Sequence, residues 1–176
     1  MVALIRTPRL ELVPLAPAVI RHLIAAERSQ AQSMIGAQLP AEFPNEDELA
    51  GFLPVQLHRM ESTPDRLQWM ARLMRASKGE IVGHCGFHGP PEVIGQAEIA
   101  YTVFTQYRGQ GYAKEAAGAL VDWAFAQGEP RVFASVSPDN APSLAVVRSL
   151  GFIQVGTQQD EVDGLELVFA AERPSP

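Results

Sequence analysis

The segment 96–128 constrains the fold most, because a strand pattern there passes through a short glycine-containing loop directly into a long helix pattern. From about Gln96 to Phe104 apolar residues alternate with other residues, as in a strand with one buried face. Beginning near Gly111, apolar residues recur about every 3.6 positions until Gly128 ends the pattern. A sheet that feeds directly into a helix is typical of the α/β and α+β classes.

Other parts of the chain repeat these two patterns. Alternation predicts strands at Arg9–Leu15, Leu67–Leu73, Ile81–Phe87, Arg131–Val136, Phe152–Thr157 and Leu165–Ala170, the last two joined by a turn at 160–164. Helical spacing predicts a helix from Pro17, a helix from Asn45 that Pro54 kinks or splits, and a helix between Asn140 and Gly151. We therefore expect one domain over residues 1–176, of the α/β (α+β) class, with a mixed, mostly antiparallel central sheet flanked by helices.

Size and charge limit the possible partners. A chain of 176 residues with 47% hydrophobic residues can fill one core. Its net charge is −6 and its 14 Lys and Arg residues are scattered, which argues against general nucleic-acid binding. The single cysteine, Cys85, excludes an internal disulfide. With no leader pattern and no run of about 20 apolar residues, we expect a cytoplasmic protein without membrane contact.

The loop Arg108–Ala113 carries the strongest chemical signal. It lies where the predicted strand ends and the predicted helix begins, and glycines at 109 and 111 let the backbone approach a ligand closely. Successive backbone N–H groups at a helix N-terminus bind phosphate or diphosphate without a lysine. The lysine of a Walker loop and the third glycine of a dinucleotide fingerprint are both missing. The alternative is that the two glycines only turn the chain.

The surrounding sequence resembles a known family. AEIAYTVFTQYRGQGYAKEAAGALVDWAF is similar to the cofactor motif of the GNAT N-acetyltransferase superfamily, which reads Arg or Gln, two residues, Gly, one residue, Gly or Ala. Arg108, Gly111 and Ala113 occupy those places. SVSPDNAPSLAVVRSLGF resembles the next strand and helix of the family, and LIRTPRLELVPL resembles the opening strand of the branch that acetylates the N-terminal alanine of ribosomal proteins.

The resemblance implies acetyl-coenzyme A as the donor substrate. It implies that the backbone of a strand end pairs with the pantetheine arm, that the glycine loop holds the diphosphate, and that the next helix contacts the arm near the sulfur. The implied cofactor-binding residues are Thr102, Val103, Phe104, Arg108, Gly109, Gln110, Gly111, Tyr112, Ala113, Asn140 and Ser143. Asn140 is equally suited to cap its helix, and Ser143 can be an ordinary first-turn serine.

Two catalytic residues follow from the same resemblance. Glu98 would accept the proton of the amine, through ordered water because it lies about 13 Å along the strand from Thr102. A backbone N–H near Val103 would stabilise the developing oxyanion. Many family members carry a tyrosine acid where this chain has Val147, so either Ser143 would hydrogen-bond the departing sulfur or water would protonate the thiolate. Tyr101 and Tyr107 are possible substitutes, although Tyr101 shares a strand face with core residues, which favours packing. The alternative for Glu98 is a solvated strand residue.

The sequence leaves two function classes open. The first is an N-acetyltransferase that acts on a protein N-terminus or a small amine, and the second is a catalytically silent acyl-coenzyme A sensor of the same fold. A nucleotide-phosphate binder is a weaker third. We expect no metal, since Cys85 with His84 and His88 lacks a second ligand pair, and we expect a monomer or homodimer. The region 36–66 is expected to shape the acceptor pocket.

Overall fold

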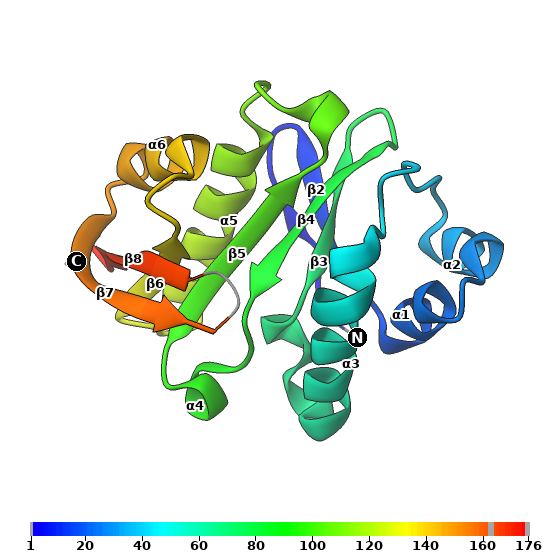
Figure 1. Cartoon of the computed structure of the whole chain (residues 1–176), viewed down its shortest axis with the longest axis horizontal. Helices are drawn as coiled ribbons and strands as arrows, with labels where there is room; N and C mark the ends of the chain where they lie inside the picture. Colours follow the sequence, from blue (N-terminus) through cyan, green and yellow to red (C-terminus); the bar gives the residue numbers. More distant parts are fainter. Residues whose placement is uncertain (1, 162–163, 175–176) are drawn as a thin grey trace.

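One mixed sheet organises the part of the chain that the computed structural model describes, residues 2–161 and 164–174. Its eight strands run in the order β1-β2-β3-β4-β5-β6-β8-β7 (Figure 1). The strands are β1 (Ile5–Arg6), β2 (Leu10–Pro14), β3 (Arg72–Ala76), β4 (Ile81–Phe87), β5 (Ala97–Val103), β6 (Arg131–Val136), β7 (Ile153–Asp160) and β8 (Gly164–Glu172). Every neighbouring pair is antiparallel except β5 with β6, which is parallel. The predicted class and the mostly antiparallel sheet are confirmed.

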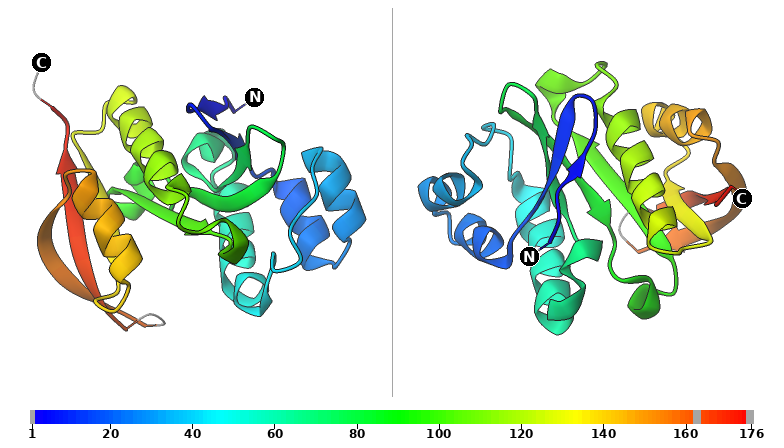
Figure 2. Two further views of the ribbon diagram at one scale, coloured as in Figure 1. Left: turned by 90° about the horizontal axis from the view of Figure 1, so that it is seen from above. Right: turned by 180° about the vertical axis from the view of Figure 1, so that it is seen from behind.

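Helices cover both faces of this sheet (Figures 1 and 2). The helices are α1 (Pro17–Ile24), α2 (Arg28–Ile35), α3 (Leu53–Ser62), the short α4 (Pro91–Ile94), α5 (Tyr112–Ala126) and α6 (Ala141–Ser149). One buried cluster joins α5 and α6 to the sheet, and a second joins α1, α2 and α3 to β3 and β4. The strands β3 and β4 contribute buried apolar side chains to both clusters and are therefore packed on both faces.

The broken helix forms as its sequence predicts. Asn45 Oδ1 accepts from the Glu48 N–H at 2.8 Å, and Glu48 Oε2 accepts from the Asn45 N–H at 2.9 Å, which is a reciprocal capping box. A π-helical turn, η1 (Glu48–Phe52), precedes α3, whose second residue is Pro54. The other carboxylate oxygen of Glu48 contacts His84 Nε2 at 2.8 Å, which ties this helix to β4.

Of the strand predicted at Leu67–Leu73, only the last two residues, Arg72 and Leu73, lie in a strand. Residues 64–69 instead form a 3₁₀ helix, η2 (Pro64–Trp69), and β3 begins only at Arg72. Pro64 suits the first turn of a helix because it lacks an N–H, and the Trp69 ring packs edge-on against Phe87. Residues 69–73 are all buried, so the alternation in their sequence does not reflect a strand with one buried face.

Several short elements were not predicted. These are β1, α2, α4 within the expected loop 88–95, and a 3₁₀ turn, η3 (Thr105–Tyr107). In α2 only Ala31 is buried, so the helix presents no apolar stripe to detect. The turn predicted at 160–164 includes residues 162–163, which lie outside the described residues.

The pairing of β5 with β6 is unusually short and determines where a ligand can enter. These strands pair only at Ala97 with Val132 and at Glu98 with Phe133. Beyond Glu98 the strands diverge, so the edge of β5 that faces β6 has no partner strand. The helix α5 starts after the end of β5, and α6 starts after the end of β6. The opening is therefore bordered by one strand edge and two helix N-termini.

Candidate active site

A groove of about 660 Å³ lies between the end of β5 and the N-termini of α5 and α6. Its lining consists of Tyr101, Thr102, Val103, Tyr107, Arg108, Gly109, Gly111, Tyr112, Ala113, Lys114, Asn140, Pro142, Ser143 and Val146. Most residues that the sequence predicted as cofactor-binding meet here, although they come from three separate stretches of the chain.

The loop before α5 owes its shape to two glycines. Gly109 has φ of 74° and Gly111 has φ of 81°, a left-handed region that disfavours residues with a Cβ atom. Gly111 is the residue before the first turn of α5, where backbone N–H groups have no acceptor within the helix. These N–H groups and the positive end of the helix dipole favour an anion, and Lys114 adds a positive charge to the lining.

The free edge of β5 supplies further backbone groups. The Phe104 N–H donates to the Val82 carbonyl at 2.9 Å, and the Glu98 carbonyl accepts from the His88 N–H at 2.9 Å. Backbone groups at positions 98 and 104 therefore face β4. Because these directions alternate along a strand, the groups of Tyr101 and Val103 face the opening. The Val103 carbonyl accepts from Arg108 Nε at 3.0 Å, so the Arg108 side chain folds back on the strand end.

Three predicted residues do not line the groove. Phe104 is 3% exposed, and its ring packs against that of Phe43 in the cluster on the other face. Gln110 points its carbonyl at the N-terminal hairpin, where it accepts from Arg9. Glu98 is 6% exposed rather than solvated, which excludes the reading of a surface strand residue.

Asn140 and Ser143, at the start of α6, take part both in the cap of the helix and in the lining of the groove. Asn140 Oδ1 accepts from the Ser143 N–H at 3.1 Å, so Asn140 is a helix cap, and both residues also line the groove. At the other end Gly151 has φ of 81°, and the Phe152 N–H donates to the Val147 carbonyl at 3.1 Å, as the LGF pattern predicts. Val147 is fully buried, so its side chain does not reach the groove.

A second cavity, of about 400 Å³, adjoins the groove between the diverging strands β5 and β6. It is lined by His88, Ile99, Ala100, Tyr101, Ala134, Ser135, Val136, Ser137, Asn140, Ser143 and Glu166. Tyr101, Asn140 and Ser143 line both hollows, so the two meet at these residues. Residues 36–66, all of which the structure describes, contribute nothing to either lining, and the expectation that they shape the acceptor pocket stays a prediction.

Polar side chains connect the second cavity to Glu98. Ser135 Oγ donates to Glu98 Oε1 at 2.6 Å, and Gln96 Nε2 donates to Glu98 Oε2 at 3.0 Å. Gln158 Nε2 donates both to Ser135 Oγ at 3.1 Å and to Glu166 Oε2 at 2.8 Å. A buried carboxylate is thus linked to the cavity through one hydroxyl, while a second carboxylate borders the cavity directly.

Tyr101 lies where the groove and the cavity meet. Its ring packs against the core cluster, as its strand position predicts, and its hydroxyl lies 3.4 Å from the Ser143 carbonyl oxygen. Burial raises the pKa of the Tyr101 hydroxyl. The phenol is therefore protonated near neutral pH.

Sequence reasoning missed three cavity residues, His88, Ser135 and Glu166. They come from the segment after β4, from β6 and from β8, and they meet only because β8 is inserted between β6 and β7 in the sheet. No local motif marks any of them. Knowledge of the strand order would have been needed to find them.

The described residues contain no cluster of three His, Cys, Asp or Glu side chains that could hold a metal ion. His84 contacts Glu48, whereas Cys85 on the opposite face of β4 is buried, which raises the pKa of its thiol to about 12. Within the described ranges, no helix is both long and apolar enough to cross a bilayer.

Comparisons with known proteins agree with this geometry. Residues 9–153 match the acetyltransferase (GNAT) domain family. The chain is 32% identical over 127 residues to the uncharacterized N-acetyltransferase YjdG of Bacillus subtilis, covering 70% of this chain and 74% of that protein. It is 37% identical over 82 residues to the uncharacterized N-acetyltransferase p20 of Bacillus licheniformis, a match that spans 46% of each protein.

Solved structures share the whole fold. An acetyltransferase from Agrobacterium tumefaciens superimposes with a TM-score of 0.66 and 28% identity over 98% of this chain and 96% of that one. RimL, a ribosomal L7/L12 alpha-N-protein acetyltransferase solved with coenzyme A, has the same fold at a TM-score of 0.65 and 17% identity, covering 97% and 98%. The chain therefore belongs to the GNAT acetyltransferase family.

Proposed function

We propose that this protein transfers an acetyl group from acetyl-coenzyme A directly to a primary amine. The observation that carries the proposal is that the groove and the second cavity meet at Tyr101, Asn140 and Ser143, between two diverging strands. A donor in the groove and an acceptor in the cavity would approach each other there. Such an arrangement brings two reactants together without a covalent enzyme intermediate.

In the proposed complex the groove binds coenzyme A, the molecule with which RimL was solved. The N–H groups of the loop 109–113 would hold the diphosphate, because they combine an anion-binding backbone with a helix N-terminus. The backbone of Tyr101 and Val103 would pair with the pantetheine arm like an added strand. Of the residues assigned from sequence, Val103 keeps this role and Tyr101 joins it, whereas the Phe104 N–H is already bonded to β4 and the Thr102 backbone faces the same way.

The cavity side would handle the proton of the amine. Ser135 Oγ donates to Glu98 and lines the cavity, so it can receive a proton from the amine while it passes its own to Glu98. This relay replaces the ordered water expected from sequence. The Tyr101 N–H, rather than the Val103 N–H expected from sequence, would donate to the carbonyl oxygen as it gains negative charge, which leaves the Tyr101 carbonyl and the Val103 N–H for the pantetheine arm. Ser143 and the protonated Tyr101 are the groups near the junction that could hydrogen-bond the departing sulfur.

The acceptor class follows from the charge at the cavity. Glu166 borders it with a carboxylate, and no Lys or Arg is among its lining residues. A cationic amine is therefore attracted before it loses its proton. Both a protein N-terminus and a small amine satisfy this requirement.

The test is incubation with radiolabelled acetyl-coenzyme A and a panel of amines that includes short peptides with free N-termini. Transfer of label to at least one amine, with release of one thiol per acetyl group, is the expected result. Saturable binding of acetyl-coenzyme A without transfer to any amine would overturn the proposal in favour of the silent sensor. That alternative rests on Val147, which stands where many relatives carry a tyrosine.

A further inference from the structure

The turn between β1 and β2 lies against the loop that precedes α5. Arg9, on this turn, donates from Nη1 to the Gln110 carbonyl at 2.8 Å and from Nε to Glu115 Oε2 at 2.6 Å. Its guanidinium also lies over the Tyr112 ring, 4.9 Å from the ring centroid. The Arg9 side chain thus contacts the residue before Gly111 and the residue after it.

Glu115, in the first turn of α5, fixes the position of Arg9. Its Oε1 accepts from Thr7 Oγ1 at 2.6 Å and from the Arg9 backbone N–H at 2.8 Å, while Oε2 binds the guanidinium. The Glu115 side chain is only 14% exposed. Burial alone would raise the pKa of this carboxyl, but the hydrogen bonds from Thr7 and Arg9 outweigh it and lower the pKa. The carboxylate is therefore ionised near neutral pH and holds the turn in place.

The hydrogen bond from Arg9 to the Gln110 carbonyl determines the direction in which the Gly111 N–H points. In a trans peptide the carbonyl of one residue and the N–H of the next point in opposite directions. Because Arg9 holds the Gln110 carbonyl toward the hairpin, the Gly111 N–H must point away from the hairpin. Arg9 Nη2 would lie 3.3 Å from a Cβ at Gly111, so the guanidinium also packs directly against this glycine.

We propose that Arg9 is a positioning residue that orients the Gln110–Gly111 peptide, so that the Gly111 N–H is presented to the diphosphate of coenzyme A. This inference rests on the proposed function for the identity of the ligand. It assigns the N-terminal hairpin a role in donor binding, although no residue of the hairpin lines the groove.

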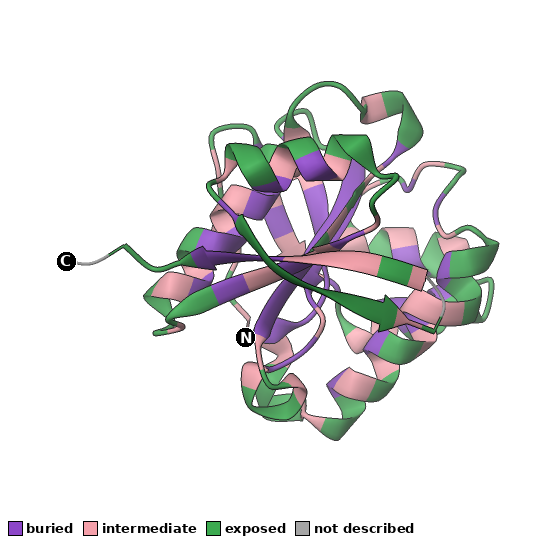
Figure 3. Cartoon of the chain, turned by 60° about the vertical axis from the view of Figure 1, so that its left-hand side comes forward, coloured by how far each residue is buried: buried purple, intermediate pink, exposed green. Residues whose placement is uncertain are grey.

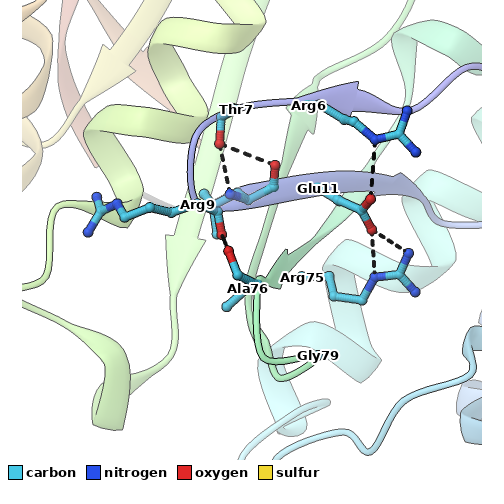
Figure 4. A pocket seen from close by; sticks show the side chains of 9 residues that line it. Arg6, Thr7, Arg9, Glu11, Arg75, Ala76 and Gly79 are labelled. Atoms are coloured by element: carbon cyan, nitrogen blue, oxygen red, sulfur yellow. Dashed lines mark hydrogen bonds and ion pairs between the residues drawn. The ribbon is translucent and has the colours of Figure 1, made fainter.

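The same hairpin provides a matched control. Arg6 and Arg75 converge on Glu11, at 3.3 Å and 2.6 Å, whereas the Arg9 side chain points away from this group (Figure 4). All of them border a shallow hollow of about 320 Å³. Arg6→Ala removes the same charge from the same hairpin as Arg9→Ala, but it leaves the contacts to Gln110 and Glu115 intact.

The experiment compares wild type, Arg9→Ala, Arg9→Lys and Arg6→Ala. Calorimetry with coenzyme A gives Kd, steady-state kinetics gives KM and kcat, and the residual dipolar coupling of the Gly111 N–H, measured by NMR without any ligand, reports the direction of that bond. We expect Arg9→Ala to raise Kd and the KM for acetyl-coenzyme A by about fivefold to tenfold and to leave kcat within about twofold. Its Gly111 N–H coupling should differ from that of wild type, because the peptide loses the contact that orients it.

Arg6→Ala and Arg9→Lys separate the effect of orienting the Gln110–Gly111 peptide from the effect of positive charge on the hairpin. Arg6→Ala should match wild type in every readout. Arg9→Lys keeps the charge but cannot bond the carbonyl and the carboxylate as a planar fork, so it should recover only part of the affinity. Equal losses in Arg9→Ala and Arg6→Ala, or wild-type affinity and a wild-type Gly111 coupling in Arg9→Ala, would overturn the inference alone. Absence of coenzyme A binding by wild type would instead overturn the proposed function, and the ligand-free coupling would still decide whether Arg9 orients the peptide.

Discussion

The groove and the second cavity differ in what they are made of. The groove offers backbone groups to a ligand, from the free edge of β5 and from a loop with two glycines of positive φ. The cavity offers polar side chains, including His88, Ser135 and Glu166, from three separate parts of the chain. In the function that we propose, the backbone groups would recognise what every donor molecule shares, whereas the side chains would distinguish one acceptor from another. Acceptor preference could then change while donor binding stays the same.

The largest expected effect concerns the cavity side. Glu98→Gln should lower kcat by about 100-fold, because the amide cannot accept the proton that Ser135 relays. Since Glu98 lines neither hollow, the Kd for coenzyme A should stay within about twofold of wild type. Pre-steady-state acetyl transfer and calorimetry on the same preparation measure both quantities. Turnover equal to wild type at every pH would remove Glu98 from the mechanism.

The next effect concerns the groove. Gly111→Val places a branched residue at φ of 81° and against Arg9, so the loop should leave its binding geometry and the Kd for coenzyme A should rise at least about tenfold. Gly128→Val is the matched control, because Gly128 has φ of 104° at the other end of α5 and is outside the groove. The control should lose thermal stability and keep its affinity. Equal affinity in both variants would contradict a groove made of backbone N–H groups.

A smaller effect, on the KM for the amine, should distinguish the Glu166 carboxylate from the Glu98 carboxylate. Glu166→Gln removes the charge that borders the cavity, so the KM for the amine should rise about fivefold while kcat and the KM for acetyl-coenzyme A stay within about twofold. Initial rates at varied amine concentration measure this. A fall in kcat as large as that of Glu98→Gln would contradict a role for Glu166 in attracting the amine alone.

The smallest effect concerns the hairpin that supports the groove. Since the folded-state pKa of Glu115 lies below its ordinary value of 4.5, its interactions stabilise the protein above about pH 4.5, and this contribution is lost as the pH falls through the folded-state pKa. Wild type should thus lose more thermal stability than Glu115→Gln between about pH 5 and pH 3. Calorimetric Tm values across this range provide the measurement. Parallel curves for both proteins would contradict the assigned role.

The difference between the groove and the second cavity also explains why the sequence predicts the first and not the second. The helix α5, its glycine loop and β5 follow from a continuous stretch, because alternation, positive-φ glycines and helical spacing all act locally. The cavity cannot be predicted from a continuous stretch of sequence, because Glu166 reaches it only through the placement of β8 beside β6. The exposed edge strand β7 was predicted at 152–157 and continues to Asp160 (Figure 3). Long-range order of the strands, rather than local pattern, is the missing information.

The most direct test of the account is an NMR titration of the uniformly ¹⁵N-labelled protein with coenzyme A. The account predicts that the amide signals of Tyr101, Val103, Gly109 and Gly111 shift together along one saturable curve, while signals from α1 and α2 remain in place. Saturable shifts confined to other parts of the molecule, or no shifts at millimolar coenzyme A, would contradict the claim that backbone groups of this groove bind the donor.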